Sequence, residues 1–184
     1  MISTATMSRS ERAGDQGVGR VFSEYRKELE WLANFLTGDE KIAAACIVDA
    51  CALAESENPY FEEWKWARLA TMCSAVQIQK SRITQLSQVY MRRPCIHAGH
   101  TVLSKDSLEI VIQESSILIS RLDVLCRFAL VICGIEKQSA REAALFLGID
   151  HTSVEGAYCA ALDSLEVISC ERFQEQNDFA AICS

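Results

Sequence analysis

Apolar side chains recur at intervals of three and four residues along most of the chain, and this spacing predicts amphipathic helices. The first helix is expected over residues 21–36, where Thr37 and Gly38 end it. Asp39 can cap a second helix that ends near Glu55, before Asn58 and Pro59 interrupt the pattern. A third amphipathic stretch starts at Tyr60 and runs to about Arg82.

The second half repeats this pattern after a segment without any sustained period. Residues 92–106 contain Pro94 and Gly99 and are interpreted as a linker. Helical patterns follow over 108–114 and 117–132, broken at Gly134, and then a short helix, a glycine turn and a longer helix. We therefore expect helical domains at 19–91 and 107–172, with flexible ends at 1–18 and 173–184.

Composition agrees with this all-α prediction of two small helical domains. The 184 residues include only two prolines and eight glycines, the residues that interrupt helices. No window reaches the 18 uncharged apolar residues of a membrane span, and no secretory leader is recognised, so a soluble cytoplasmic protein is expected. The nine cysteines include no C-x-x-C pair and are interpreted as buried thiols.

One segment of the second half carries a specific motif. Ser139 followed by Glu142 has the spacing of a capping box, so a helix is predicted from Ala140. Gly148 supplies a turn, and Asp150 or Thr152 can cap a further helix from residue 153 to about 165. This layout is a helix-turn-helix whose small core residues permit a close crossing, namely Ala143, Ala144, Leu147, Val154, Ala157, Ala161 and Leu165.

The order of these features resembles RNA polymerase sigma factors of the extracytoplasmic-function type. The string from Ser139 through Glu142 and Gly148 to Leu165 is similar to the promoter-reading domain of that family, as is the preceding stretch from Leu122 to Leu130. The sequence Leu36-Thr37-Gly38-Asp39, an alanine-rich stretch, and Phe61-x-x-Trp64 resemble the domain that clamps polymerase and melts promoter DNA. The resemblance covers about residues 20 to 170.

This resemblance implies a transcription initiation protein that binds RNA polymerase core and promoter DNA, under the control of an anti-sigma regulator. The polymerase-binding candidates are Asp39, Glu40 and Asp49. Contacts to DNA would come from the start of the last helix and from the third helix, through His151, Thr152, Ser153, Tyr158, Lys80 and Arg82. Trp64 is expected in the core rather than as a platform for a base.

The charge of the predicted reading helix departs from the family. The net charge is −7, whereas a protein that grips nucleic acid usually presents a basic face. Residues 139–166 hold one arginine against five acidic residues, and the expected outward positions are Glu155, Gly156, Ala157 and Ala160. The alternative is therefore a helical adaptor on the same fold that binds polymerase or another regulator without specific DNA readout.

Two other classes of function find little support in the sequence. Cys95, His97 and His100 have the residue types of a metal site, and they would suit a metal- or thiol-controlled regulator. They offer only three donors without a matching fourth, so no metal or other cofactor is expected. No nucleophile with a neighbouring base, phosphate-binding glycine loop or paired carboxylates appears, and we do not expect an enzyme.

Overall fold

The computed structural model describes residues 19–56, 62–92 and 103–182, and every regular element in these ranges is a helix. This confirms the all-α class predicted from the helical spacing. The chain divides into two compact units, one up to Gln79 and one from Lys80. The division falls within a helix, whereas most of the expected linker, residues 93–102, lies outside the described ranges.

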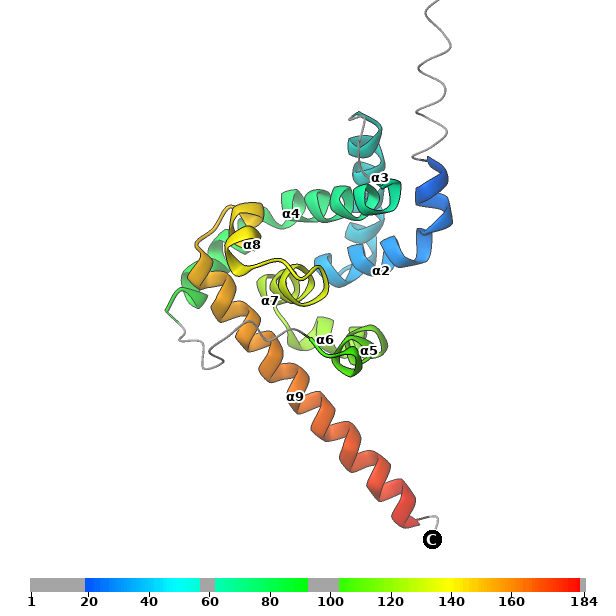
Figure 1. The fold of residues 1–184 in the computed structure, drawn as a ribbon, viewed down its shortest axis with the longest axis vertical. Helices are drawn as coiled ribbons and strands as arrows, with labels where there is room; N and C mark the ends of the chain where they lie inside the picture. The colour runs from blue at the N-terminus through cyan, green and yellow to red at the C-terminus, as the bar shows by residue number, and fades with distance from the viewer. Residues whose placement is uncertain (1–18, 57–61, 93–102, 183–184) are drawn as a thin grey trace, which may run out of the picture. The chain divides into compact units, whose positions relative to one another are not determined.

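The first unit contains a helical segment at 19–24, α2 (Arg26–Thr37), α3 (Glu40–Ser56) and the beginning of α4 (Glu63–Tyr90). Helices α2 and α3 pack against each other (Figure 1). Gly38 ends α2 in the left-handed region with φ 73°, and the Asp39 carboxylate accepts hydrogen bonds from the amides of Lys41 and Ile42 at 2.8 and 3.0 Å. Both predicted caps are confirmed.

The core of this unit is built from one face of each helix. Its buried cluster comprises Val21, Phe22, Leu29, Ala50, Ala54, Ala67 and Ala70. Alanines of both α3 and α4 belong to this cluster, and Trp64 packs against it with its ring centroid 4.3 Å from that of Tyr25. The side-chain amide of Gln79 donates to the Thr37 carbonyl at the end of α2, at 3.1 Å.

The second unit contains the end of α4, α5 (Lys105–Gln113), α6 (Ser115–Arg121), α7 (Val124–Ala129), a π-helix η1 (Leu130–Ile135), α8 (Ala140–Leu147) and α9 (His151–Ile182). Helix α9 is its longest element, drawn orange to red in Figure 1, and it contacts α5, α7, η1 and α8. The core of the unit therefore lies along the first half of α9.

Several helix boundaries differ from those expected from the sequence, and the helix expected over 21–36 is interrupted at Tyr25. Helix α4 continues past Arg82 to Tyr90, and α9 continues past Leu165 to Ile182, because both extensions lack proline and glycine. The single helix expected at 117–132 is divided, since Leu122 is extended and Asp123 caps α7 by accepting from the Cys126 amide at 2.9 Å. Gly134, the expected break, lies within η1.

Candidate functional site

The predicted helix-turn-helix is present in the second unit. The Ser139 hydroxyl accepts from the Glu142 amide at 3.2 Å, and the Glu142 carboxylate accepts from the Ser139 amide at 2.8 Å, which completes the capping box. Gly148 ends α8 with φ 69°. The Asp150 carboxylate accepts from the Thr152 amide at 2.8 Å, so Asp150 rather than Thr152 caps α9.

Small residues allow α8 and α9 to cross closely, as the sequence predicted. All seven expected core positions of this motif are buried, and Ala143, Val154, Ala157 and Ala161 have no exposed surface. Leu147 and Leu165 are buried as well. The local fold expected from the motif is therefore confirmed, independently of any role in DNA binding.

The three residues that begin α9 lie in very different environments. His151 is exposed, beside the Asp150 carboxylate at 3.7 Å. Thr152 is half-buried and its hydroxyl donates to Asp150 at 2.6 Å. Ser153 is fully buried and its hydroxyl donates to the carbonyl of Ser87 in α4, at 2.9 Å. Only His151 thus presents an exposed polar edge of the kind that a DNA contact requires.

The next turns of α9 correct the expectation that they face outward. Gly156 and Ala160 are buried, as is Ala157, which the helix-turn-helix spacing had also placed in the core, and Glu155 is the exposed residue among the four. The expected outward face was wrong because it was taken from the family pattern, whereas α9 is enclosed on several sides within its own unit. An α-helix reads DNA with a face that is free to enter the major groove, and the first turns of α9 expose only His151 and the acidic Glu155 fully.

Tyr158 completes the predicted DNA-binding set on α9, and it is half-buried. Burial, with a smaller effect from Cys133, raises the pKa of its phenol to about 12. Its hydroxyl lies 3.4 Å from the position that a Cβ would occupy at Gly134, so it packs against η1. The side chain is thus part of the packing between η1 and α9.

The remaining DNA-binding candidates lie on α4 and are exposed. Lys80 and Arg82 both belong to the second unit and face solvent. In the first unit, Trp64 is half-buried beneath the guanidinium of Arg68, which lies 5.4 Å from the ring centroid. Tyr25 and Arg68 both pack against the Trp64 ring. This is expected for a core residue rather than for a platform on which a base stacks.

The three polymerase-binding candidates are exposed in the first unit. Asp39 and Glu40 lie at the start of α3, and Asp49 lies in its middle. Asp39 also caps α3, so a substitution there would alter the helix as well as the surface charge. Asp49 has no such structural task among the described contacts and is the cleaner position for a test.

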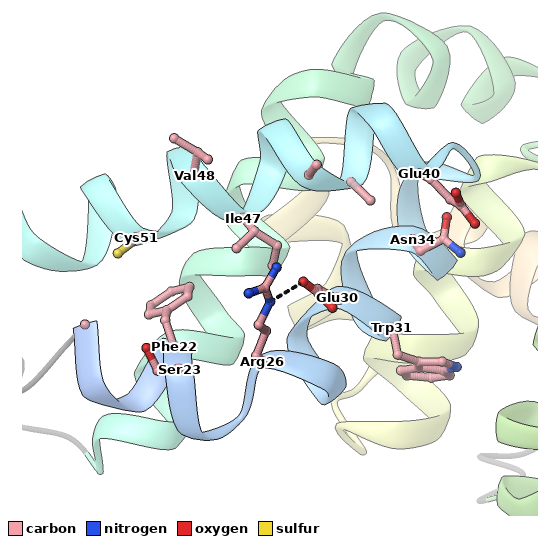
Figure 2. A pocket seen from close by; sticks show the side chains of 13 residues that line it. Phe22, Ser23, Arg26, Glu30, Trp31, Asn34, Glu40, Ile47, Val48 and Cys51 are labelled. Carbon is pink, nitrogen blue, oxygen red and sulfur yellow. Dashed lines mark hydrogen bonds and ion pairs between the residues drawn. The ribbon is translucent and has the colours of Figure 1, made fainter.

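An open groove of about 740 Å³ is lined by residues of the segment 19–34 and of α3 (Figure 2). Phe22 and Ile47 supply apolar walls, and on the α2 side the Arg26 guanidinium donates to the Glu30 carboxylate one turn further along, at 2.6 Å. Glu40 lies at one end, while Val48 is 69% exposed on α3. The groove is mixed in character, and its lining also includes the Ser23 hydroxyl and the Cys51 thiol.

A buried polar network at the end of α4 was not foreseen from the sequence. The Tyr90 hydroxyl donates to the Asp123 carboxylate at 2.6 Å and accepts from the Cys126 thiol at 3.0 Å. Burial and these hydrogen bonds raise the pKa of Tyr90 well above its usual range, so the phenol stays protonated. The only sequence signal was Asp123 itself, a charge that interrupts the most apolar run of the chain.

Arg127 is a buried charged residue beside this network. Its guanidinium donates to the carbonyls of Ile119 and Leu122, at 2.9 and 3.1 Å. Carbonyl groups at the end of α6 thereby gain a hydrogen-bond donor. Its Nε atom is buried without a hydrogen-bond partner. Burial lowers the pKa of Arg127, and the nearby Asp123 carboxylate opposes that shift.

The cysteines agree only in part with the prediction of buried thiols. Cys46 and Cys126 are buried thiols, and burial raises the pKa of the Cys133 thiol to about 12, which makes that thiol unreactive. Cys170 is a thiol but is exposed, and Cys159 forms a disulfide. Cys95, His97 and His100 lie outside the described residues, and the described residues contain no group of three metal-binding side chains.

Comparisons with known proteins leave the family unassigned. No model of a known protein family matches the chain, and no curated protein or solved structure matches it. Within the described residues, no helix combines the length and the apolar content that a membrane crossing requires.

Proposed function

We propose that this protein is a helical transcription adaptor that binds RNA polymerase core without reading duplex promoter DNA through α9. The observation that carries the proposal is the burial of the first turns of α9. Ser153, Val154 and Ala157 have no exposed surface, and the exposed Glu155 and Asp150 would face phosphates with negative charge. The polymerase partner follows from the resemblance to sigma factors.

The surface proposed for polymerase is the exposed side of α3. Glu40 and Asp49 offer carboxylates at the two edges of this side without a described salt bridge, and the exposed Val48 lies between these edges. A protein surface of this kind favours a partner that carries basic and apolar side chains together, because charge complementarity speeds association and fixes the orientation. An anti-sigma regulator would be a second partner, and it would compete with polymerase core for binding to this protein.

A sigma factor that does bind DNA is the second candidate. Lys80 and Arg82 favour it, since both are exposed cations on one helix and can reach a phosphate backbone. Such contacts position a protein on DNA but do not select a sequence. Sequence selectivity would therefore have to arise in the complex with polymerase core. This candidate predicts promoter-selective binding that appears only when core is present.

The test combines a pull-down with polymerase core and fluorescence anisotropy with promoter-like and scrambled duplexes. The adaptor predicts core binding that Asp49→Lys weakens about tenfold or more, as charge reversal at an interface does, and no preference between the duplexes. Lys41→Glu on the same helix is the matched control, since Lys41 is exposed and its reversal adds acidity. Core-dependent selectivity would instead establish the sigma factor, and failure to bind core would overturn both.

A further inference from the structure

The last turns of α4 are joined to the start of α9 by a hydrogen bond from Ser153 to Ser87. Ile83, Ser87 and Tyr90 lie on one buried face of this segment, whereas Val89 and Met91 on other faces are exposed. Residues 83–91 are therefore buried along a single face. A helix end fastened on one face detaches at lower cost than a helix enclosed on all sides, because fewer contacts are lost.

Two side-chain hydrogen bonds, called anchors below, join this segment to residues far away in the sequence. The first is the hydrogen bond from the Ser153 hydroxyl to the Ser87 carbonyl, at 2.9 Å. That carbonyl also accepts the ordinary helical bond from the Met91 amide, at 2.9 Å, so the Ser153 bond adds to an intact helix. Detaching α4 would leave α4 helical and would release the Ser153 hydroxyl.

The second anchor is the Tyr90 hydroxyl, which joins α4 to the start of α7. It donates to one oxygen of the Asp123 carboxylate, while the other oxygen caps α7 through the Cys126 amide. Asp123 would keep its capping role if Tyr90 left, because the two oxygens are used separately. The Cys126 thiol, now buried against Tyr90, would become accessible.

We propose that residues 83–91 form a latch, whose release uncovers the first turn of α9 and the Cys126 thiol while the rest of the second unit stays folded. This inference goes beyond the proposed function, because it identifies what keeps α9 covered there. Helix α4 is continuous from Glu63 in the first unit, so a partner that grips the first unit can act on the latch through the helix backbone. Release by such a partner would couple binding to the exposure of α9.

The experiment compares wild type with Tyr90→Phe, Ser153→Ala and the double variant by peptide-level amide hydrogen exchange in the full chain. Loss of both anchors should speed exchange about tenfold in 83–91 and in 151–156, since two net hydrogen bonds are lost. Exchange in 161–168 should remain at the wild-type rate. Ser164→Ala is the matched control, because that hydroxyl bonds only within α9, to the Ala160 carbonyl at 3.0 Å.

Alkylation followed by mass spectrometry gives a second readout at Cys126, with the buried Cys46 of the first unit as the internal reference. The latch predicts faster labelling of Cys126 relative to Cys46 in Tyr90→Phe. Unchanged exchange and labelling in the double variant would overturn the proposal, and so would equal acceleration over the whole second unit, which indicates lost global stability. Neither readout uses polymerase or DNA, so the result is independent of the test of the proposed function.

Discussion

Gly148 is the residue on which the helix-turn-helix depends most directly. Its φ of 69° lies in the left-handed region, which costs a residue with a Cβ about 1 kcal/mol, while no atom lies within 4 Å of the position of an added Cβ. We expect Gly148→Ala to lower the free energy of unfolding by about 1 kcal/mol, for conformational reasons alone. Urea denaturation followed by circular dichroism measures this change.

Gly19 provides the control for this substitution. It too has open space around an added Cβ, but its φ is outside the left-handed region. Gly19→Ala should leave stability unchanged or raise it slightly, because alanine is the better helix former. Equal stabilities of Gly148→Ala and wild type would contradict the role assigned to the turn.

The Glu142 carboxylate makes the capping box dependent on pH. Hydrogen bonds from the Ser139 hydroxyl and amide lower the pKa of Glu142 below its usual value. A carboxylate whose pKa is lowered on folding stabilises the protein above its unfolded pKa, roughly pH 4, and this contribution is lost as the pH falls through the folded value. Wild type should therefore lose stability on acidification over that window.

Glu142→Gln isolates this contribution, because glutamine keeps the shape but does not titrate. The stability difference between wild type and this variant should be largest near neutral pH and should shrink as the pH falls below about 4. Asp150 also has a lowered pKa and is intact in both proteins, so its effect cancels in the comparison. A difference that stays constant from neutral to acidic pH would show that the carboxylate does not cap α8 as a charged group.

At the scale of elements, the crossing of α8 and α9 limits which side chains the second unit tolerates. Ala143 has no exposed surface, so leucine there would force the helices apart, at a cost of about 1–3 kcal/mol. Leu145 on the same helix is 84% exposed, and Leu145→Ala should change stability by less than about 0.5 kcal/mol. Thermal unfolding of both variants checks this, and a stable Ala143→Leu would contradict the close crossing.

The boundaries of elements show why local sequence was an incomplete guide. The caps at Asp39, Ser139 and Gly148 could be predicted because each depends on residues within four positions. The break before α7 was missed because Leu122 is buried on the same apolar stripe and leaves the helical period intact. The lengths of α4 and α9 were underestimated because the end of a helix without proline or glycine is set by packing.

At the scale of the whole molecule, net charge opposes binding to duplex DNA. The chain carries −7, and the start of α9 adds local acidity at Asp150 and Glu155. We expect no saturable binding of the wild-type chain alone to a short duplex at moderate salt. Anisotropy titrations across a range of salt concentrations measure this.

Reversing the charge of two exposed acidic residues of α9 distinguishes nonspecific electrostatic binding from sequence recognition. Glu155→Lys with Asp163→Lys should produce binding that weakens steeply as salt rises, since added cations displace counterions from phosphates. It should produce no preference between promoter-like and scrambled duplexes, because the buried face of α9 still cannot reach base edges. Selective binding by the doubly reversed variant would show that α9 reads DNA after all.

The candidate site was predictable only in its local parts. Sequence spacing located the helix-turn-helix and placed Asp39, Glu40 and Asp49 where they are exposed. It could not show that Ser153 bonds to Ser87, because these residues are 66 positions apart and their meeting depends on how α4 and α9 pack. The network of Tyr90, Asp123 and Cys126 was missed for the same reason.

By itself, the sequence determined that this protein is helical, where its capped turns lie, and which small residues line the crossing of α8 and α9. These features follow from hydrogen bonds and side-chain periods within one or two turns of chain. The tertiary structure alone decided which face of α9 is covered and which polar groups are paired at the end of α4. Burial is a property of the neighbours that long-range packing brings together, and the helical period cannot distinguish a face turned toward DNA from one enclosed by other helices.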